Sequence, residues 1–100
     1  MIHHIVFWKL KPQAHGNNAE HNGRAIKRML SALPPLIPQV RRLSVGPDIN
    51  RSPAAWDLAL DTVFDSPKDL QTYQIHPEHQ KVVAFISEAA SARAVVDFED

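Results

Sequence analysis

The sequence contains no cysteine, and this absence excludes several kinds of chemistry. Disulfide frameworks, thiol nucleophiles and metal sites with cysteine ligands all need that residue. The absence is compatible with the cytoplasm, where we expect the chain to work. Only three glycines occur, and no glycine-rich loop follows a predicted strand. A dinucleotide or flavin site is therefore not indicated.

The chain also lacks an excess of either charge and a long apolar run. Eleven basic residues balance eleven acidic residues, so the formal net charge is zero. The chain therefore has no excess of basic residues that would attract nucleic acid or an anionic membrane. The apolar stretch within residues 1–12 is broken by two histidines and a lysine, is too short to span a bilayer and carries no small-residue cleavage site. We therefore expect neither a nucleic-acid nor a membrane partner.

The length of 100 residues and the hydrophobic fraction of 44% suit one domain, residues 1–100. Residues 2–10 alternate with a period of two and carry apolar side chains on both faces, which indicates a strand inside a sheet. Asn17 or Asn18 can cap a following helix. Its apolar stripe covers residues 26–33, and the pair Pro34-Pro35 ends it.

The rest of the chain is predicted to form three strands and a second helix. Residues 40–45 and 56–64 are predicted to be strands. Ser66 and Pro67 start a helix that runs to about Gln74, Pro77 restarts it, and residues 94–98 form a last strand. The resulting order, β-α-β-β-α-β, predicts a ferredoxin-like α+β fold in which a four-stranded antiparallel sheet has its helices on one face.

Two helices can cover only one face of such a sheet. The face expected to stay uncovered carries six large apolar residues: Val6, Trp8, Trp56, Leu58, Leu60 and Phe64. An apolar surface of this size is unusual on a monomer. Pairing two sheets about a two-fold axis would bury it, so we predict a homodimer in the form of a dimeric α/β barrel.

Four segments carry a resemblance to a known family. They are His4–Lys11, Trp56–Leu60, Tyr73–Gln80 and Ala94–Phe98, and they span almost the whole chain. The segment from Tyr73 to His79, followed by Val82 and Val83, is the most specific. The chain resembles the stress-responsive A/B barrel domain family, which implies a dimeric α+β barrel.

The resemblance implies less about activity, because most bacterial relatives have no established reaction. A plant branch contains polyketide cyclases, which close a linear poly-β-keto chain by an aldol-type step. In that branch a tyrosine and a histidine at the positions matching Tyr73 and His79 perform acid–base catalysis. Positions matching His4 and His76 help to line the pocket. This chain departs from the branch at Leu58, where the cyclases carry a further pocket histidine.

The residues themselves allow two interpretations of the segment around Pro77. Proline at the first helical position places His79 about one turn into a helix, on a similar side to His76. A histidine can take a proton from a carbon flanked by carbonyls, and the Tyr73 hydroxyl can donate to the enolate oxygen that forms. Equally, His76 can cap the helix, His79 can bond to a backbone carbonyl and Tyr73 can belong to the core.

The candidate catalytic residues are therefore Tyr73 and His79. The candidate substrate-binding residues are His4, His76, Trp8 and Leu58. His4 shares a strand face with Trp8 and would line the barrel if that face meets the partner. A metal site made of His4, His76 and His79 has no recognised spacing and no carboxylate to complete it. We predict no metal and no cofactor.

These observations leave two functions open. The first is a pocket protein that binds a small hydrophobic, keto or phenolic compound and acts as a cofactor-free cyclase or isomerase through Tyr73 and His79. The alternative is a non-catalytic dimeric domain that binds a ligand or supports a stress response. A third alternative is a haem-binding monooxygenase of a neighbouring dimeric barrel family, but no feature of this sequence specifically indicates it.

Overall fold

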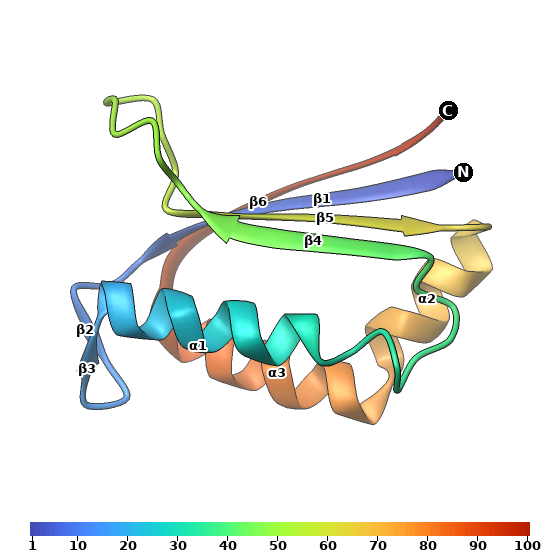
Figure 1. Cartoon of the computed structure of the whole chain (residues 1–100), viewed down its shortest axis with the longest axis horizontal. Helices are drawn as coiled ribbons and strands as arrows, with labels where there is room; N and C mark the ends of the chain where they lie inside the picture. Colours follow the sequence, from blue (N-terminus) through green and yellow to red (C-terminus); the bar gives the residue numbers. More distant parts are fainter.

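Strand β1, Ile2–Leu10, runs through the inside of a four-stranded antiparallel sheet in the computed structural model, which describes residues 1–100 (Figure 1). It pairs with β5, Leu58–Phe64, on one side and with β6, Ala90–Glu99, on the other. Strand β4, Arg42–Pro47, pairs with β5 and gives the order β4-β5-β1-β6. The predicted ferredoxin-like α+β fold is confirmed.

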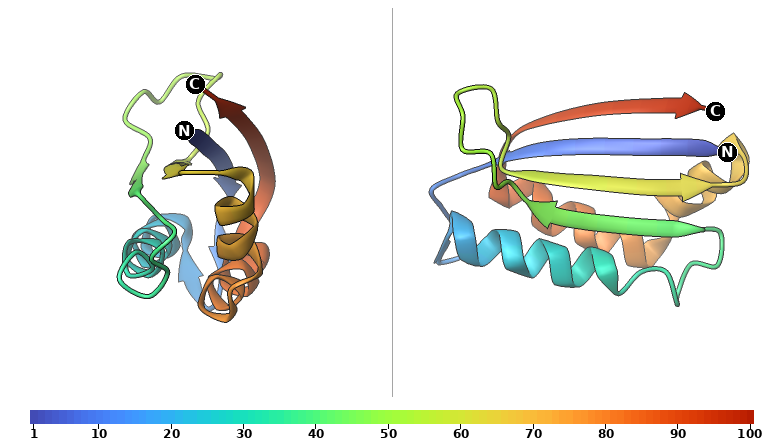
Figure 2. Two further views of the ribbon diagram at one scale, coloured as in Figure 1. Left: turned by 90° about the vertical axis from the view of Figure 1, so that its right-hand side faces the viewer. Right: turned by 45° about the horizontal axis from the view of Figure 1, so that its top comes forward.

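Three helices lie on one side of this sheet: α1, Ala19–Ser31; α2, Pro67–Ile75; and α3, Pro77–Ala89 (Figures 1 and 2). Their starts are set locally by side chains that accept a backbone N–H of the first turn. Asn18 caps α1, Ser66 caps α2 and His76 caps α3. None of the three helices combines the length and the apolar character needed to cross a membrane.

Some boundaries differ from the prediction. A two-residue hairpin, β2 (Gln13–Ala14) and β3 (Asn17–Asn18), fills the polar segment before α1. Strand β4 starts two residues later than expected, and β6 starts at Ala90, four residues earlier than expected. The first residues of β6 are small and show no apolar alternation, but pairing with β1 extends to Leu10 opposite Ala90. Backbone pairing of this kind leaves little trace in the sequence.

The predicted facing of the sheet is wrong. Five of the six residues expected on the uncovered face pack in the core against the helices: Val6, Trp8, Leu58, Leu60 and Phe64. The sixth, Trp56, precedes β5 and lies beside Lys9, whose Nζ is 5.0 Å from the centroid of the Trp56 ring. A period of two shows which residues share a face, but it does not show which face the helices cover.

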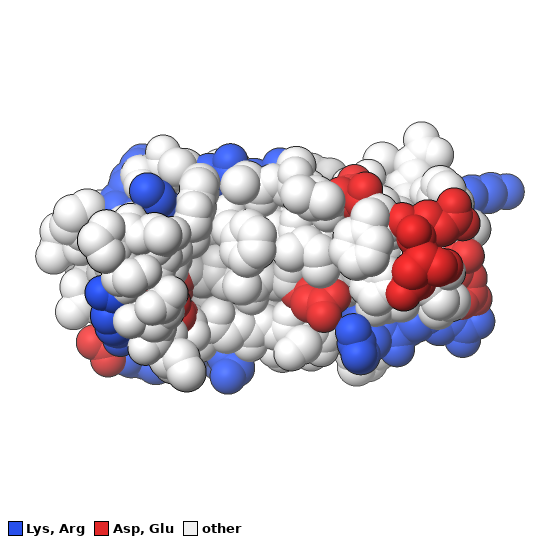
Figure 3. Space-filling view, turned by 90° about the horizontal axis from the view of Figure 1, so that it is seen from above, with Lys and Arg blue, Asp and Glu red and all other residues white.

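The face away from the helices, here called the open face, is nevertheless apolar at its centre. Successive residues of β1 alternate between the two faces, so Phe7 lies on this side together with Val96 and Phe98 of β6. Their exposed fractions are 36%, 57% and 46%. His3 stacks on Phe98 with 4.6 Å between the ring centroids. In Figure 3, which views this side, a broad area without charged residues occupies the middle.

Candidate functional site

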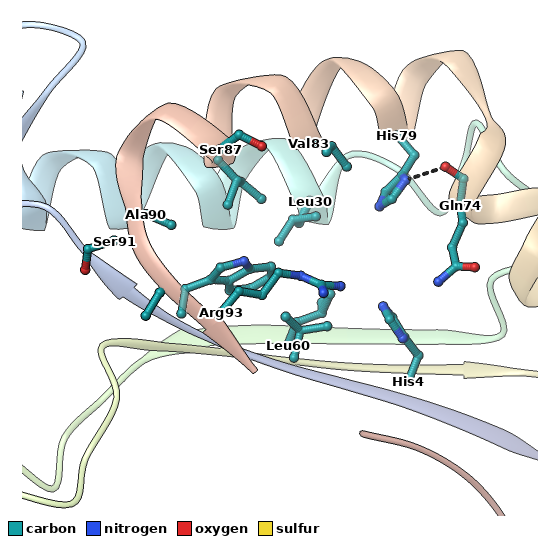
Figure 4. Close-up of a pocket in the computed structure, with 14 residues that line it drawn as sticks. His4, Leu30, Leu60, Gln74, His79, Val83, Ser87, Ala90, Ser91 and Arg93 are labelled. Atoms are coloured by element: carbon teal, nitrogen blue, oxygen red, sulfur yellow. Dashed lines mark hydrogen bonds between the residues drawn. The ribbon is translucent and has the colours of Figure 1, made fainter. Parts of the chain in front are cut away.

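A cavity of about 340 Å³ opens between the helix-covered face of the sheet and helix α3 (Figure 4). Most of its wall is apolar and includes Val6, Trp8, Leu30, Leu60, Val83 and Ile86. Its polar groups are His4, Gln74, His79, Ser87, Ser91 and Arg93. The cavity therefore lies within one subunit, and the expectation that the His4 face would meet a partner subunit is wrong. An apolar pocket with a few polar groups is typical of a small-molecule site.

His79 presents one ring nitrogen to this cavity (Figure 4). Its Nδ1 lies 3.1 Å from the backbone oxygen of Gln74. A carbonyl oxygen only accepts, so Nδ1 carries the proton and Nε2 keeps its lone pair. Burial is the main reason why the pKa of His79 lies below its ordinary value, and the charges of His4, Arg93 and His76 lower the pKa further. At neutral pH the ring is therefore an uncharged base.

Tyr73 is completely buried in contact with His79. The ring centroids of the two residues are 4.2 Å apart, and the Phe64 ring lies on Tyr73 at 5.1 Å. The phenol oxygen has no hydrogen-bond partner. Burial raises the pKa of Tyr73 far above its ordinary value, so the hydroxyl keeps its proton and can only serve as a donor or a neutral acceptor. Tyr73 is not among the residues that line the cavity.

His4 reaches the cavity from β1 and is held by a carboxylate of β6. Its Nδ1 lies 2.5 Å from Oδ1 of Asp97, which occupies the facing position in the strand pair. His4 is 3% exposed, and the Thr62 hydroxyl donates to the His4 carbonyl at 3.0 Å. Because the carboxylate accepts the Nδ1 proton, Nε2 is the nitrogen left for a ligand. Sequence reasoning missed Asp97, whose role depends on the register between β1 and β6.

The other predicted site residues lie in different surroundings. Trp8 lines the cavity, whereas His76 and Leu58 do not. His76 caps α3, because its Nδ1 accepts the Glu78 N–H at 3.1 Å. Leu58 is 2% exposed and belongs to the core. The ligand-binding role assigned to these two residues stays a prediction.

Sequence analysis did not propose Gln74 or Arg93 as site residues. Gln74 fixes His79 through its carbonyl, and Arg93 places a guanidinium on the wall. The predicted last strand began at Ala94, one residue too late to include Arg93, which the register between β1 and β6 places opposite Trp8. No group of three histidine and carboxylate side chains is arranged to hold a metal ion.

These features define an α+β domain of ferredoxin-like topology with a histidine-lined cavity between the sheet and the helices. The family model described as Stress responsive A/B Barrel Domain matches residues 2–100. The chain belongs to this family, and the resemblance found in its sequence is confirmed. No curated protein matches the chain in sequence.

Solved structures share the fold over nearly the whole chain. A dimeric protein of unknown function with a ferredoxin-like fold from Bacteroides fragilis is 31% identical, with a TM-score of 0.88 over 99% of this chain and 95% of that one. A dimeric ferredoxin-like protein of unknown function from Thermobifida fusca is 24% identical, with a TM-score of 0.85; the match covers 99% of this chain and 90% of that one. A hydroxynitrile lyase from Passiflora edulis is 19% identical, with a TM-score of 0.82; the match covers 97% of this chain and 90% of that one.

Proposed function

We propose that the chain binds a small carbonyl compound in its cavity and moves a proton at the carbon next to the carbonyl group. His79 is the base, and no cofactor takes part. One observation carries this proposal: a neutral, partly buried imidazole has its Nδ1 proton committed to the Gln74 carbonyl while its ring faces an apolar cavity. Positioned bases of this kind are what enolisation, aldol closure and isomerisation need.

Tyr73 does not line the cavity, but its ring contacts His79, and it is the proposed donor to the oxygen on which negative charge develops once that oxygen enters between the cavity and the Tyr73 hydroxyl. A buried hydroxyl without a partner costs about 1–3 kcal/mol, and a ligand oxygen that enters beside His79 would supply the missing partner. The phenol keeps its proton at neutral pH, as a donor must. The contact between the Tyr73 and His79 rings supports a joint role for the pair.

We also propose that the protein is a homodimer joined through the open face. The apolar surface of Phe7, Val96 and Phe98 supports this assembly, because a monomer would leave it in water. The solved relatives from Bacteroides fragilis and Thermobifida fusca, described as dimeric, support it as well. The cytoplasmic location stays a prediction.

A non-catalytic ligand-binding domain is the second candidate. The capping bond of His76 favours it, because that histidine is accounted for by helix structure alone. Under this reading the cavity binds its ligand without proton transfer, and His79 only anchors the start of α3.

Deuterium exchange separates the two candidates. Phenylpyruvate is a suitable probe, since its C3 protons are acidified by the keto group and its ring matches the apolar wall. Proton NMR in D₂O follows loss of the C3 signal with wild type, with His79→Gln and with the control His21→Gln, which changes an exposed histidine of α1. We expect wild type and the control to accelerate exchange, and His79→Gln to lose about a hundredfold of that acceleration. Binding with no acceleration would replace the proposal by the second candidate.

A further inference from the structure

Arg93 is the one permanently charged side chain on the cavity wall. No aspartate, glutamate or lysine lines this space. Arg93 lies opposite Trp8 in the β1–β6 pair, and its guanidinium points along the cavity in the direction of His4 and His79 (Figure 4). A cation therefore stands within an otherwise uncharged set of lining residues.

This guanidinium has no partner within the chain. Arg24, Arg41 and Arg42 each pair with a carboxylate, whereas Arg93 makes neither an ion pair nor a side-chain hydrogen bond. The nearest acid on its own strand face, Asp97, is four residues away, or about 13 Å along a strand. Asp97 is also already paired with His4. Arg93 is exposed on the edge strand β6, so its donors face water when no ligand is bound and are available to a ligand.

We propose that Arg93 makes the cavity selective for compounds that carry a single carboxylate. The planar guanidinium fork matches the two oxygens of a carboxylate and holds them with two parallel hydrogen bonds. One cation balances one negative charge, and no lysine or second arginine stands on the wall to balance a phosphate dianion. The carboxylate selectivity rests on the proposed function only in that the cavity binds a ligand, whereas the orientation of the ligand's carbonyl group also rests on His79 as the base.

The lining residues then orient the rest of the molecule. With the carboxylate on Arg93, an apolar body packs against Trp8, Leu60 and Val83. The carbon next to the carbonyl group lies toward His79. The substrate class is therefore a small keto acid or phenolic acid with an apolar chain or ring.

Arg93 and His79 also influence one another electrostatically. The positive charge of Arg93 acts together with burial and with His4 and His76 to lower the pKa of His79. A bound carboxylate cancels the charge of Arg93 and adds an anion near the imidazole. The pKa of His79 therefore rises when a carboxylate ligand binds, and a neutral ligand lacks this effect.

Two matched probes test the selectivity. Phenylpyruvate and its methyl ester share the ring and the keto group but differ in charge. Their dissociation constants are measured by NMR titration with wild type, with Arg93→Gln and with Arg28→Gln. The last variant is the control, because Arg28 is exposed on α1, has no ion pair and is not among the residues that line the cavity.

We expect wild type and Arg28→Gln to bind the carboxylate about tenfold or more tightly than the ester, and Arg93→Gln to bind the two about equally. Equal binding of both probes by wild type, or a preference that survives in Arg93→Gln, overturns the inference and leaves the proposed function standing. Failure of wild type to bind either probe overturns both. A carboxylate preference without C3 exchange supports Arg93 and counts against catalysis.

The titration of His79 gives a second readout. Phenylpyruvate is expected to raise the pKa of the His79 imidazole in wild type, and to raise it less in Arg93→Gln, as observed by NMR of the ring protons. A shift of the same size with the methyl ester would contradict direct recognition of the carboxylate.

Discussion

The imidazole of His4 and the carboxylate of Asp97 lie 2.5 Å apart at facing positions of β1 and β6. The histidine is buried, and the acid is 43% exposed at the edge strand. The pair fixes which nitrogen of His4 is available to the cavity. It also ties β6, the strand that carries Arg93, to the wall opposite His79.

Asp97→Asn tests this pair. Loss of the charge on the acceptor should weaken the hydrogen bond to a buried ring and lower the free energy of unfolding by about 1–2 kcal/mol. Denaturant unfolding measures the change. The control is Glu99→Gln, which removes an acid from the same face of β6 where no ion pair is formed. An equal loss in both variants would show that the pair has no special role.

Tyr73→Phe is expected to keep or raise stability while impairing the site. The change removes a buried hydroxyl that has no partner and leaves the ring that packs on Phe64 and His79. The melting temperature should therefore not fall, because an unpaired buried polar group is unfavourable. Exchange of phenylpyruvate should slow. A clear drop in melting temperature would show that the hydroxyl stabilises the core and would contradict this prediction.

The pH dependence of stability should report on His79. The folded protein holds the pKa of this residue below its ordinary 6.5, so the unfolded chain takes up a proton where the folded protein does not. Acidification through pH 6.5 therefore favours unfolding, and stability recovers as the pH rises above that value. His79→Gln should lose less stability over this range than wild type. Identical pH profiles for wild type and His79→Gln would contradict the lowered pKa.

A charged residue on the open face should dissociate the proposed dimer. Phe7→Asp places a charge among the apolar side chains of this face and should convert the assembly to a folded monomer of 11.2 kDa. Sedimentation equilibrium measures the mass. Ile49→Asp is the control, because Ile49 is 93% exposed outside the sheet. A wild-type protein that is already monomeric would end the argument for a homodimer.

Local sequence signals were sufficient to predict the fold. Asn18, Ser66 and Pro77 mark helix starts that the structure confirms, since caps and prolines act within a few residues. The facing of the sheet was not predictable, because alternation at Leu58 or Leu60 is the same whichever face the helices cover.

The candidate site was predictable only in part. His79 and His4 belong to a recognisable sequence pattern, and both line the cavity. Asp97 and Arg93 come near them only through the register of β6, whose first residues are small and lack alternation. The orphan hydroxyl of Tyr73 is likewise a property of packing in three dimensions.

The central claim is that the cavity beneath α3 holds the ligand, and intermolecular nuclear Overhauser effects test it most directly. Spectra are recorded on wild type with bound phenylpyruvate. We expect contacts from the ring protons of the probe to the methyl groups of Leu60, Val83 and Ile86, which line the cavity. Contacts to Val96 on the open face instead, or none with any cavity methyl group, would contradict the account.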